Sequence, residues 1–252
     1  MNWIFVTASF GEARFHDSAK RLLSQAKRMG IFDDFIHVTD SNLDEYAPRV
    51  FELYASSLNS KTIGYGFYTW KPEIVLTLLE RNFGSGVMYV DAGCEMNSKW
   101  FARLRLRLMT LNTRNGGFFH KLNYPESYYT KKYVLDYFSL KESQKNSTQI
   151  QATWFLLSGE KGRRIAQNWV DACLSSLRLV DDSIDSENDE FIENRYDQSV
   201  LSCLLKVSGI KPKTHVPCYR PITLGSKIRC YFHPVWSSRN RSGVSIQGLK
   251  GM

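Results

Sequence analysis

The chain has 252 residues, of which 43% are hydrophobic and 23% charged, which suits one folded domain with a buried core. No apolar run reaches the ~20 residues that a membrane-spanning helix needs, and the N-terminus lacks the features of a secretory signal peptide. The net charge of +8 is spread along the chain and accompanies no recognition module for nucleic acids, so no nucleic-acid partner is expected.

The first elements in chain order predict an α/β fold. Residues 3–8 form an apolar, β-branched run typical of a buried strand. Apolar residues between 19 and 29 then recur at helical spacing, and Gly30 ends the pattern. Residues 35–39 read as a second strand. A strand, a helix and a strand joined by short connections indicate a mostly parallel sheet flanked by helices.

Later elements continue this pattern. Pro72 can occupy the first turn of a helix, whose apolar spacing continues until Gly84. Further strands are predicted at 87–90, 117–119 and 153–157, and further helices at 165–179 and 199–208. Residues 211–252 carry Pro, Gly and basic residues without a period, and we expect them to wrap over the core. The chain shows no repeat or linker, so residues 1–252 are predicted to form a single domain.

The five cysteines are dispersed, at positions 94, 173, 203, 218 and 230. An odd number without paired spacing is not typical of a disulfide framework or a zinc ribbon and fits a reducing compartment. A cytoplasmic location is therefore expected.

Asp91 is the first candidate site residue. It directly follows the predicted strand 87–90, and in open parallel sheets the ligand crevice lies beyond the carboxyl ends of the strands. A carboxylate at this place can hold a hard cation that in turn binds phosphates. The spacing fits equally well a simple turn or a cap for a helix starting near Asn97.

Lys71 is the second candidate. It follows two glycines and several aromatic residues in segment 64–72 and precedes a predicted helix start, where a lysine beside helix amides suits a diphosphate. The alternative is an aromatic loop packed on the core, with Lys71 in solvent.

Two further groups lie near the C-terminus. Asp197 and Gln198 offer a carboxylate and an amide to sugar hydroxyls, although Asp197 also stands where a helix N-cap would be. His233, Arg239 and Arg241 could complete a metal and diphosphate site, or belong to a basic tail without order.

The remaining candidates carry less weight. His16, His37, His120 and His215 lack companions at metal or triad spacing, and the common hydrolase, NTPase and dinucleotide motifs are absent. The arginines of segment 103–107 alternate with leucines and fit either a helix face near a phospholipid surface or a solvated stripe.

Three segments, taken in order, resemble a group of bacterial polysaccharide glycosyltransferases. They are Gly-Tyr-Gly-Phe-Tyr-Thr-Trp-Lys-Pro at 64–72, Tyr-Val-Asp-Ala-Gly-Cys-Glu-Met-Asn at 89–97, and Arg-Tyr-Asp-Gln-Ser-Val-Leu-Ser at 195–202. The resemblance spans roughly residues 7–241 and implies a fold of the GT-A type, a single nucleotide-sugar-binding α/β domain.

The resemblance also implies roles for the candidate residues. Asp91 stands where an Asp-x-Asp motif holds a divalent cation, Mn²⁺ or Mg²⁺, but Gly93 makes the motif degenerate, and Glu95 could partly compensate. Asp197 and Gln198 resemble the Asp-Gln segment of retaining GT-A enzymes related to glycogenin, and His233 resembles their C-terminal metal-binding histidine.

The sequence therefore predicts transfer of a sugar from a nucleoside diphosphate sugar, with UDP as the expected nucleotide, in lipopolysaccharide or capsule synthesis and with retention. The expected acceptor is a glycan or lipid-linked glycan, with peripheral contact at the inner membrane. Lys71, Arg239 and Arg241 would stabilise the diphosphate, and Thr7, Ala8 and Ser9 would line the base and ribose. A sugar-phosphate nucleotidyltransferase and an inactive glycan-binding module remain alternatives.

Overall fold

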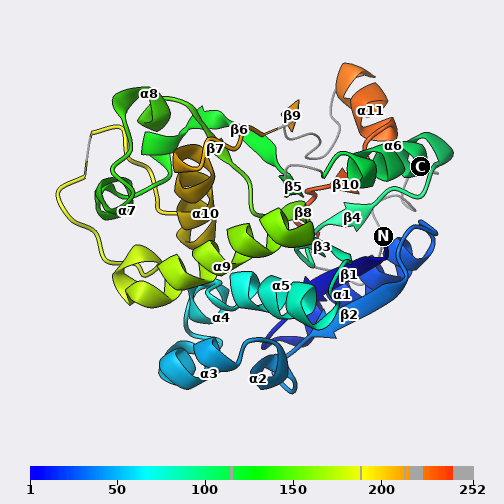
Figure 1. Cartoon of the computed structure of the whole chain (residues 1–252), viewed down its shortest axis with the longest axis horizontal. Helices are drawn as coiled ribbons and strands as arrows, with labels where there is room; N and C mark the ends of the chain where they lie inside the picture. The colour runs from blue at the N-terminus through cyan, green and yellow to red at the C-terminus, as the bar shows by residue number, and fades with distance from the viewer. Residues whose placement is uncertain (114–115, 188, 213, 216–223, 241–252) are drawn as a thin grey trace.

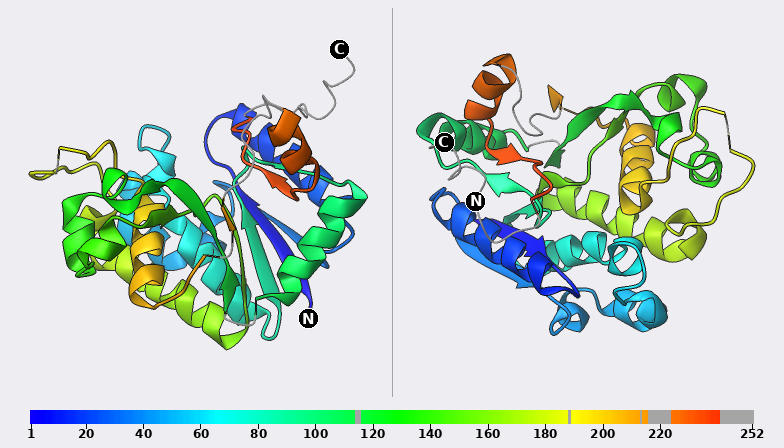
Figure 2. Two further views of the ribbon diagram at one scale, coloured as in Figure 1. Left: turned by 90° about the horizontal axis from the view of Figure 1, so that it is seen from above. Right: turned by 180° about the vertical axis from the view of Figure 1, so that it is seen from behind.

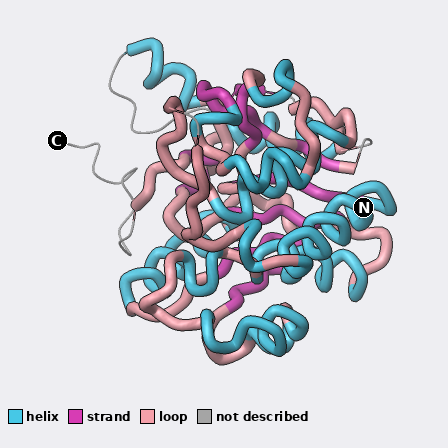
Figure 3. Tube along the Cα trace, turned by 90° about the vertical axis from the view of Figure 1, so that its left-hand side faces the viewer, coloured by secondary structure: helices cyan, strands magenta, loops and turns pink. Residues whose placement is uncertain are grey.

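The computed structural model describes residues 1–113, 116–187, 189–212, 214–215 and 224–240. Helices surround the strands in all views (Figures 1 and 3). The described strands are β1 (Trp3–Ala8), β2 (Asp34–Val38), β3 (Gly86–Val90), β4 (Glu95–Met96), β5 (Gly117–Phe118), β6 (His120–Pro125), β7 (Thr148–Ile150), β8 (Trp154–Ser158), β9 (Thr214–His215) and β10 (Val235–Trp236).

The described helices complete the fold. They are α1 (Ala13–Lys27), α2 (Leu43–Tyr46), α3 (Pro48–Tyr54), α4 (Gly64–Phe67), α5 (Trp70–Arg81), α6 (Trp100–Leu111), α7 (Lys132–Tyr137), α8 (Glu142–Lys145), α9 (Gly159–Ser175), α10 (Tyr196–Val207) and α11 (Leu224–Tyr231). Short 3-10 turns lie at η1 (Ala55–Ser57), η2 (Glu126–Tyr128) and η3 (Leu177–Leu179).

A five-stranded sheet in the order β2-β1-β3-β8-β5 forms the centre of the molecule. Strand β1 pairs in parallel with β2 and β3, whereas β8 runs antiparallel to both β3 and β5. Four of the five strands therefore point the same way, and the predicted mostly parallel sheet is confirmed. Because β1 and β3 are adjacent and parallel, the residues that follow them meet at one edge of the sheet.

Successive side chains of a strand point to opposite faces, and both faces of this sheet are buried. Ile4 and Val6 join a core with helices α5, α9 and α10, while Trp3 and Phe5 join a second core with α1 and α6. Figure 2 shows the sheet between these two helical layers. Burial on both faces explains why the strands read as continuous apolar runs in the sequence.

Helices α9 and α10 have boundaries that differ from the predicted ones. Helix α9 begins at Gly159 rather than at 165, and it ends at Ser175 because Ser176 is extended, with φ −161°. Helix α10 begins at Tyr196, three residues earlier than predicted, so Asp197 lies inside the first turn. The N-cap position belongs to Arg195, and the reading of Asp197 as a cap is wrong.

The described part of the C-terminal segment packs against the core. Strand β10 pairs antiparallel with β4, which follows β3 after a short turn, and Val235 and Trp236 are buried. The expectation that residues 211–252 as a whole wrap over the core stays a prediction. Arg241 and the residues after it lie outside the described ranges.

The cysteines were expected to be free thiols in a reducing compartment, and only some of them are. Cys94, Cys173 and Cys203 are buried free thiols, but Cys230 is disulfide-bonded. Since disulfides are rare in reducing compartments, the cysteines give no support to a cytoplasmic location. None of the described helices is long and apolar enough to cross a membrane.

Two buried histidines, His120 and His233, lie against Trp154. His233 belongs to the C-terminal segment. The ring centroid of His120 lies 3.9 Å from that of Trp154, and the ring of His233 lies 5.7 Å from it. Burial lowers the pKa of His120 well below its usual range and lowers the pKa of His233 to about 3. Both imidazoles are therefore neutral at neutral pH.

Acid should destabilise the fold through these histidines. Their folded-state pKa values lie below the ordinary value of about 6.5, so between about pH 3 and 6.5 the unfolded chain binds more protons. The free energy of unfolding should therefore fall as pH drops below about 6.5, by up to about 1.4 kcal/mol per pH unit for each histidine. Urea titrations of the wild type, His233→Asn and the control His16→Asn, whose side chain is 26% exposed, measure this slope. A slope unchanged in His233→Asn would contradict the assignment.

Candidate functional site

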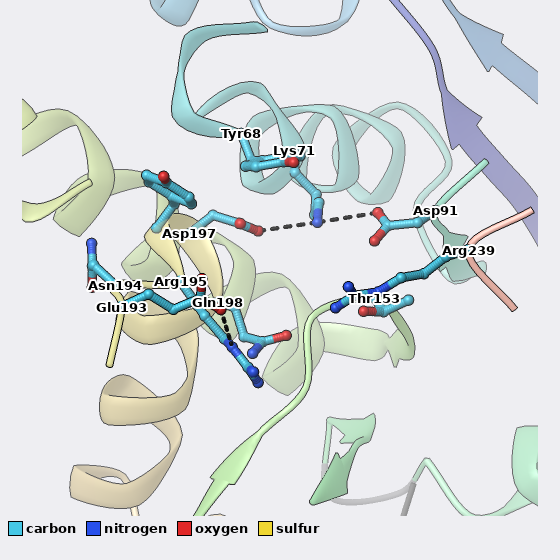
Figure 4. A pocket seen from close by; sticks show the side chains of 11 residues that line it. Tyr68, Lys71, Asp91, Thr153, Glu193, Asn194, Arg195, Asp197, Gln198 and Arg239 are labelled. Carbon is cyan, nitrogen blue, oxygen red and sulfur yellow. Dashed lines mark ion pairs between the residues drawn. The ribbon is translucent and has the colours of Figure 1, made fainter. Parts of the chain in front are cut away.

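A pocket of about 200 Å³ lies where β3, α5, α10 and the C-terminal segment meet. Figure 4 shows its side chains. The lining residues are Tyr68, Lys71, Asp91, Thr153, Glu193, Asn194, Arg195, Tyr196, Asp197, Gln198 and Arg239. Five of the predicted site residues thus come together from distant parts of the sequence. The volume lies below the ~300–1,000 Å³ of sites that enclose a drug-sized ligand, so this pocket suits one part of a larger substrate.

Lys71 is the buried centre of this pocket. Its ammonium nitrogen lies 3.2 Å from Asp91 Oδ1 and 3.2 Å from Asp197 Oδ2, while its side chain is only 4% exposed. The nitrogen also donates a hydrogen bond of 3.4 Å to the carbonyl of Ala152. Lys71 lies in the first turn of α5, and the alternative of a solvated lysine is wrong.

Burial and charge act against each other in this group. Burial alone would lower the pKa of the Lys71 ammonium, but Asp197 and Asp91 reverse the effect and raise it. Burial raises the pKa of Asp197 to about 7, although Lys71 opposes this shift. Lys71 is therefore a cation at neutral pH, and its charge favours the ionised form of Asp197 against the effect of burial.

Asp91 presents its carboxylate to the pocket from the end of β3. Its side chain is 34% exposed, and Oδ1 accepts a hydrogen bond of 2.9 Å from the Tyr89 hydroxyl. The backbone turns directly afterwards, with a hydrogen bond from Cys94 N to the carbonyl of Asp91. Asp91 therefore both forms a turn and faces the pocket.

The Asp91 carboxylate could bind a divalent cation, but the pocket supplies few further protein ligands. The lining contains no histidine, and His233 lies buried beside His120 and Trp154. The described residues include no group of three or more His, Cys, Asp or Glu able to hold a metal. Mg²⁺ is commonly bound by one or two carboxylates together with substrate phosphates and water, so a cation here would depend on the bound donor.

Glu95 does not supply a second carboxylate to the pocket. It is fully buried, and its carboxylate accepts hydrogen bonds from Asn240 Nδ2 at 2.9 Å and Gln25 Nε2 at 3.3 Å. Its role is to hold the C-terminal segment against α1.

Gln198 lines the pocket with an amide that is already engaged. Its Oε1 accepts a hydrogen bond of 3.0 Å from Ala152 N, and its Nε2 donates one of 2.8 Å to Gln149 Oε1. The carbonyl of Asp197 accepts a hydrogen bond from Trp169 Nε1 at 3.0 Å. The first turn of α10 is thus fixed on several sides, which orients the Asp197 carboxylate toward Lys71.

Three lining residues have unusual backbone conformations. Tyr68, Tyr196 and Arg239 have positive φ angles of 61°, 47° and 51°, which is uncommon for residues with a side chain and tends to concentrate at functional sites. The rings of Tyr68 and Tyr196 lie 5.9 Å apart. Sequence reasoning missed both tyrosines, because nothing in a sequence reports a left-handed tyrosine.

Arg21 is another residue that sequence reasoning missed. It is buried in α1, and its Nη2 donates hydrogen bonds to the carbonyls of Ala92, Cys94 and Asn240 at 3.0–3.1 Å. It therefore joins the turn after Asp91 to the segment that carries Arg239. Arg21 is not one of the apolar residues whose spacing predicted the helix, so the pattern gave no sign of its burial.

The predicted nucleotide-binding residues Thr7, Ala8 and Ser9 do not line this pocket. All three are buried at the end of β1, and the Thr7 hydroxyl has no hydrogen-bond partner among the described residues. Ser9 Oγ lies 2.7 Å from His37 Nε2 and 3.0 Å from His16 Nδ1.

The two histidines beside Ser9 have companions that their sequence spacing does not reveal. His16 Nε2 also lies 3.5 Å from Asp40 Oδ2. Burial, followed by the charges of His16 and Lys20, lowers the pKa of His37. The ends of β1 and β2 thus carry a polar cluster of Ser9, His16, His37 and Asp40.

Comparison with solved structures identifies the fold class. A glycosyltransferase involved in the glycosylation of the major capsid of PBCV-1 is 9% identical, with 94% of this chain and 92% of that chain covered and a TM-score of 0.51. The apo form of mouse xyloside xylosyltransferase 1 is 10% identical, with 97% and 100% covered and a TM-score of 0.48. The assignment rests on the first of these. The chain has a GT-A-type α/β fold, as predicted.

Comparisons at the level of sequence give no such likeness. No family model matches the chain, and no curated protein matches it. The shared fold alone does not establish an activity.

Replacing Lys71 with Met should destabilise the protein strongly. The change leaves two carboxylates beside a buried apolar side chain, and breaking a buried ion pair from one side costs about 3–5 kcal/mol. Adding Asp197→Asn should recover part of the loss, because one buried charge is then removed. Urea unfolding of both single variants and the double variant measures the coupling. The exposed control Lys161→Met should change stability by about 0.5 kcal/mol or less, and additive effects at positions 71 and 197 would disprove the pairing.

Proposed function

We propose that this protein is a glycosyltransferase that moves a sugar from a nucleoside diphosphate sugar to a hydroxyl group of a glycan or glycolipid. The observation that carries the proposal is the pocket beyond β3, where Lys71 is fixed between Asp91 and Asp197 and faces the same space as Arg239. This pocket stands at the crevice edge of a fold shared with a known glycosyltransferase. The expected donor is a UDP-sugar, and the expected pathway is bacterial surface polysaccharide synthesis.

The chemistry requires stabilisation of a diphosphate leaving group. Negative charge grows on the diphosphate as the glycosidic bond breaks, and cations already held in place stabilise it without reorganisation. Lys71 is held by its two carboxylates, and the Arg195 guanidinium is held over the Tyr129 ring at 3.6 Å. Arg239 adds a third cation, on a backbone that Arg21 anchors. A Mn²⁺ or Mg²⁺ ion bound by Asp91 would supply further Lewis-acid stabilisation.

The nucleotide would extend from this pocket toward the ends of β1 and β2. Ser9 with His37 and Asp40 offers both donors and acceptors there, and the Thr7 hydroxyl is buried beside them without a hydrogen-bond partner among the described residues. A path from this cluster to the pocket would cross the carboxyl edge of the adjacent strands β1 and β3. This arrangement supports the predicted roles of segment 7–9 as part of a larger base and ribose site.

Asp197 is proposed to position the sugar rather than to act as a base. Its carboxylate lies against Lys71 and is 4% exposed, so an acceptor hydroxyl would have to displace that contact to reach it. In a retaining reaction the leaving diphosphate can accept the acceptor's proton on the same face, and no separate base is needed. Retention is therefore the proposed outcome.

Two alternative functions can be distinguished from glycosyl transfer by the reaction that each would show. A nucleotidyltransferase would release a diphosphate from a nucleoside triphosphate and would form, not consume, a nucleotide sugar. A glycan-binding module would bind sugar without turnover. The likeness to a glycosyltransferase fold favours transfer over both.

Nucleotide binding should depend on a cation through Asp91. UDP, tested first in a panel of nucleoside diphosphates and their sugars, should raise the melting temperature more with Mn²⁺ than with EDTA, because the cation would neutralise both the diphosphate and the carboxylate. Asp91→Ala should abolish this difference, whereas the exposed control Asp136→Ala should keep it. An equal shift with EDTA would disprove the cation role of Asp91 while leaving transfer itself open to a turnover assay.

The product should keep the anomeric configuration of the donor. Asp197→Asn should lower kcat/KM by about ten- to a hundredfold through lost positioning, with the pH profile of the residual activity unchanged. The anomeric proton coupling of the product, measured by NMR with a donor of known configuration, decides the stereochemistry. An inverted product, together with a rate that falls below about pH 7 in the wild type only, would make Asp197 the general base.

A further inference from the structure

Helix α6 is apolar on two different faces. Ala102, Leu106 and Met109 are buried against the sheet. On another face Trp100, Leu104, Leu108 and Leu111 are 65%, 42%, 54% and 72% exposed. Their spacing of four, four and three residues places these four side chains in one stripe along the helix. We call Trp100, Phe101, Leu104, Leu108 and Leu111 the apolar stripe.

Residues at the end of α11 extend the apolar stripe. Phe101 lies 4.7 Å from Trp100 and 5.1 Å from Phe232, measured between ring centroids, and Phe232 lies 5.2 Å from Tyr231. Phe101, Tyr231 and Phe232 are 45%, 40% and 39% exposed. Figures 1 and 2 show α6 and α11 next to each other on the side of the molecule away from α7. Segments far apart in sequence thus build one continuous aromatic and aliphatic surface.

The charged residues of α6 and the preceding residue Lys99 are all positive. Arg103, Arg105 and Arg107 are the only charged residues of α6, and helical geometry places them along the two borders of the stripe. Lys99 lies 4.0 Å from the centre of the Tyr231 ring. Neither α6 nor α11 contains an acidic residue.

We propose that the apolar stripe, with Tyr231 and Phe232, docks the protein on the surface of a bilayer that contains anionic lipids. Helices that lie in a membrane interface combine Trp, Phe and Leu on one face with flanking Lys and Arg, and each cation near an anionic surface adds to the attraction. A protein partner that covered this surface would need acidic groups around an apolar centre. A second copy of α6 would instead bring like charges together, which opposes self-association.

Docking on this face would bring the bilayer close to the pocket. Helix α6 begins four residues after β4, whose partner strand β10 leads within three residues to Arg239. A bilayer held against α6 therefore lies next to the segment that closes one side of the pocket. The inference concerns a surface outside the pocket and does not depend on the proposed reaction.

Co-sedimentation with vesicles tests the docking. The wild type should bind vesicles of phosphatidylcholine with phosphatidylglycerol and release them in high salt, and it should bind phosphatidylcholine alone at least about tenfold more weakly. Leu104→Ser/Leu108→Ser should reduce binding to the anionic vesicles at least about tenfold. Arg107→Glu should reduce it about fivefold or more.

Matched controls lie on distant elements. Leu53→Ser on α3 removes an equally exposed leucine, and Lys132→Glu on α7 reverses an exposed charge; both should bind as the wild type does. Circular dichroism and melting confirm that each variant folds. Trp100→Phe should remove part of the blue shift in tryptophan emission that binding produces.

Three results would overturn the proposal. The first is no binding of the folded wild type to anionic vesicles. The second is equal loss of binding in the control variants. The third is a dimer in light scattering that Leu104→Ser/Leu108→Ser converts to a monomer without vesicle binding in either form, which would assign the surface to a second copy of the chain.

Discussion

The buried ammonium of Lys71 is the constraint on which the site depends. It joins the start of α5, the end of β3 and the first turn of α10 through two contacts of 3.2 Å. A buried lysine without partners would lose its proton, and two carboxylates this close to each other would repel. Each charge is therefore tolerable only because the other two are present. Any ligand that draws Asp91 or Asp197 away must replace its charge, and a phosphate group is a chemically suitable replacement.

The surrounding backbone is shaped to hold this arrangement. Tyr68 and Tyr196 adopt left-handed conformations directly before Thr69 and Asp197, at the beginnings of α5 and α10. Such conformations cost about 1–3 kcal/mol each and persist only when neighbouring packing fixes them. Here the tilted contact between the Tyr68 and Tyr196 rings and the hydrogen bond from the Trp169 indole to the Asp197 carbonyl provide that packing. The strain is concentrated around one pocket, which is the pattern expected of a site selected for precise placement of charge.

The sequence predicted the sheet and helices well because their signals are local. Strands such as 3–8 are apolar throughout because both faces of the sheet are covered. Gly30 follows the end of α1 at Lys27 and adopts a left-handed conformation. The site was predicted only as separate candidates, because the contact between Lys71 and Asp197 joins residues 126 positions apart. For His233, the resemblance to a known family implied a role that its position in the fold does not support. Its place in the chain suggested a metal ligand, but the fold buries it against Trp154.

The described part of the C-terminal segment lies between the pocket and the proposed docking surface. Arg21 holds the carbonyls of Ala92, Cys94 and Asn240 together, so the turn after Asp91 and the backbone beside Arg239 move as one unit. The same segment continues back through β10 to α11, beside α6. A membrane at α6 and α11 would therefore lie beside the wall of the pocket that carries Arg239, whereas Lys71 and Asp197 belong to α5 and α10 in the opposite helical layer. The fold thus separates a rigid centre of charge from a boundary that a surface-bound acceptor could reach.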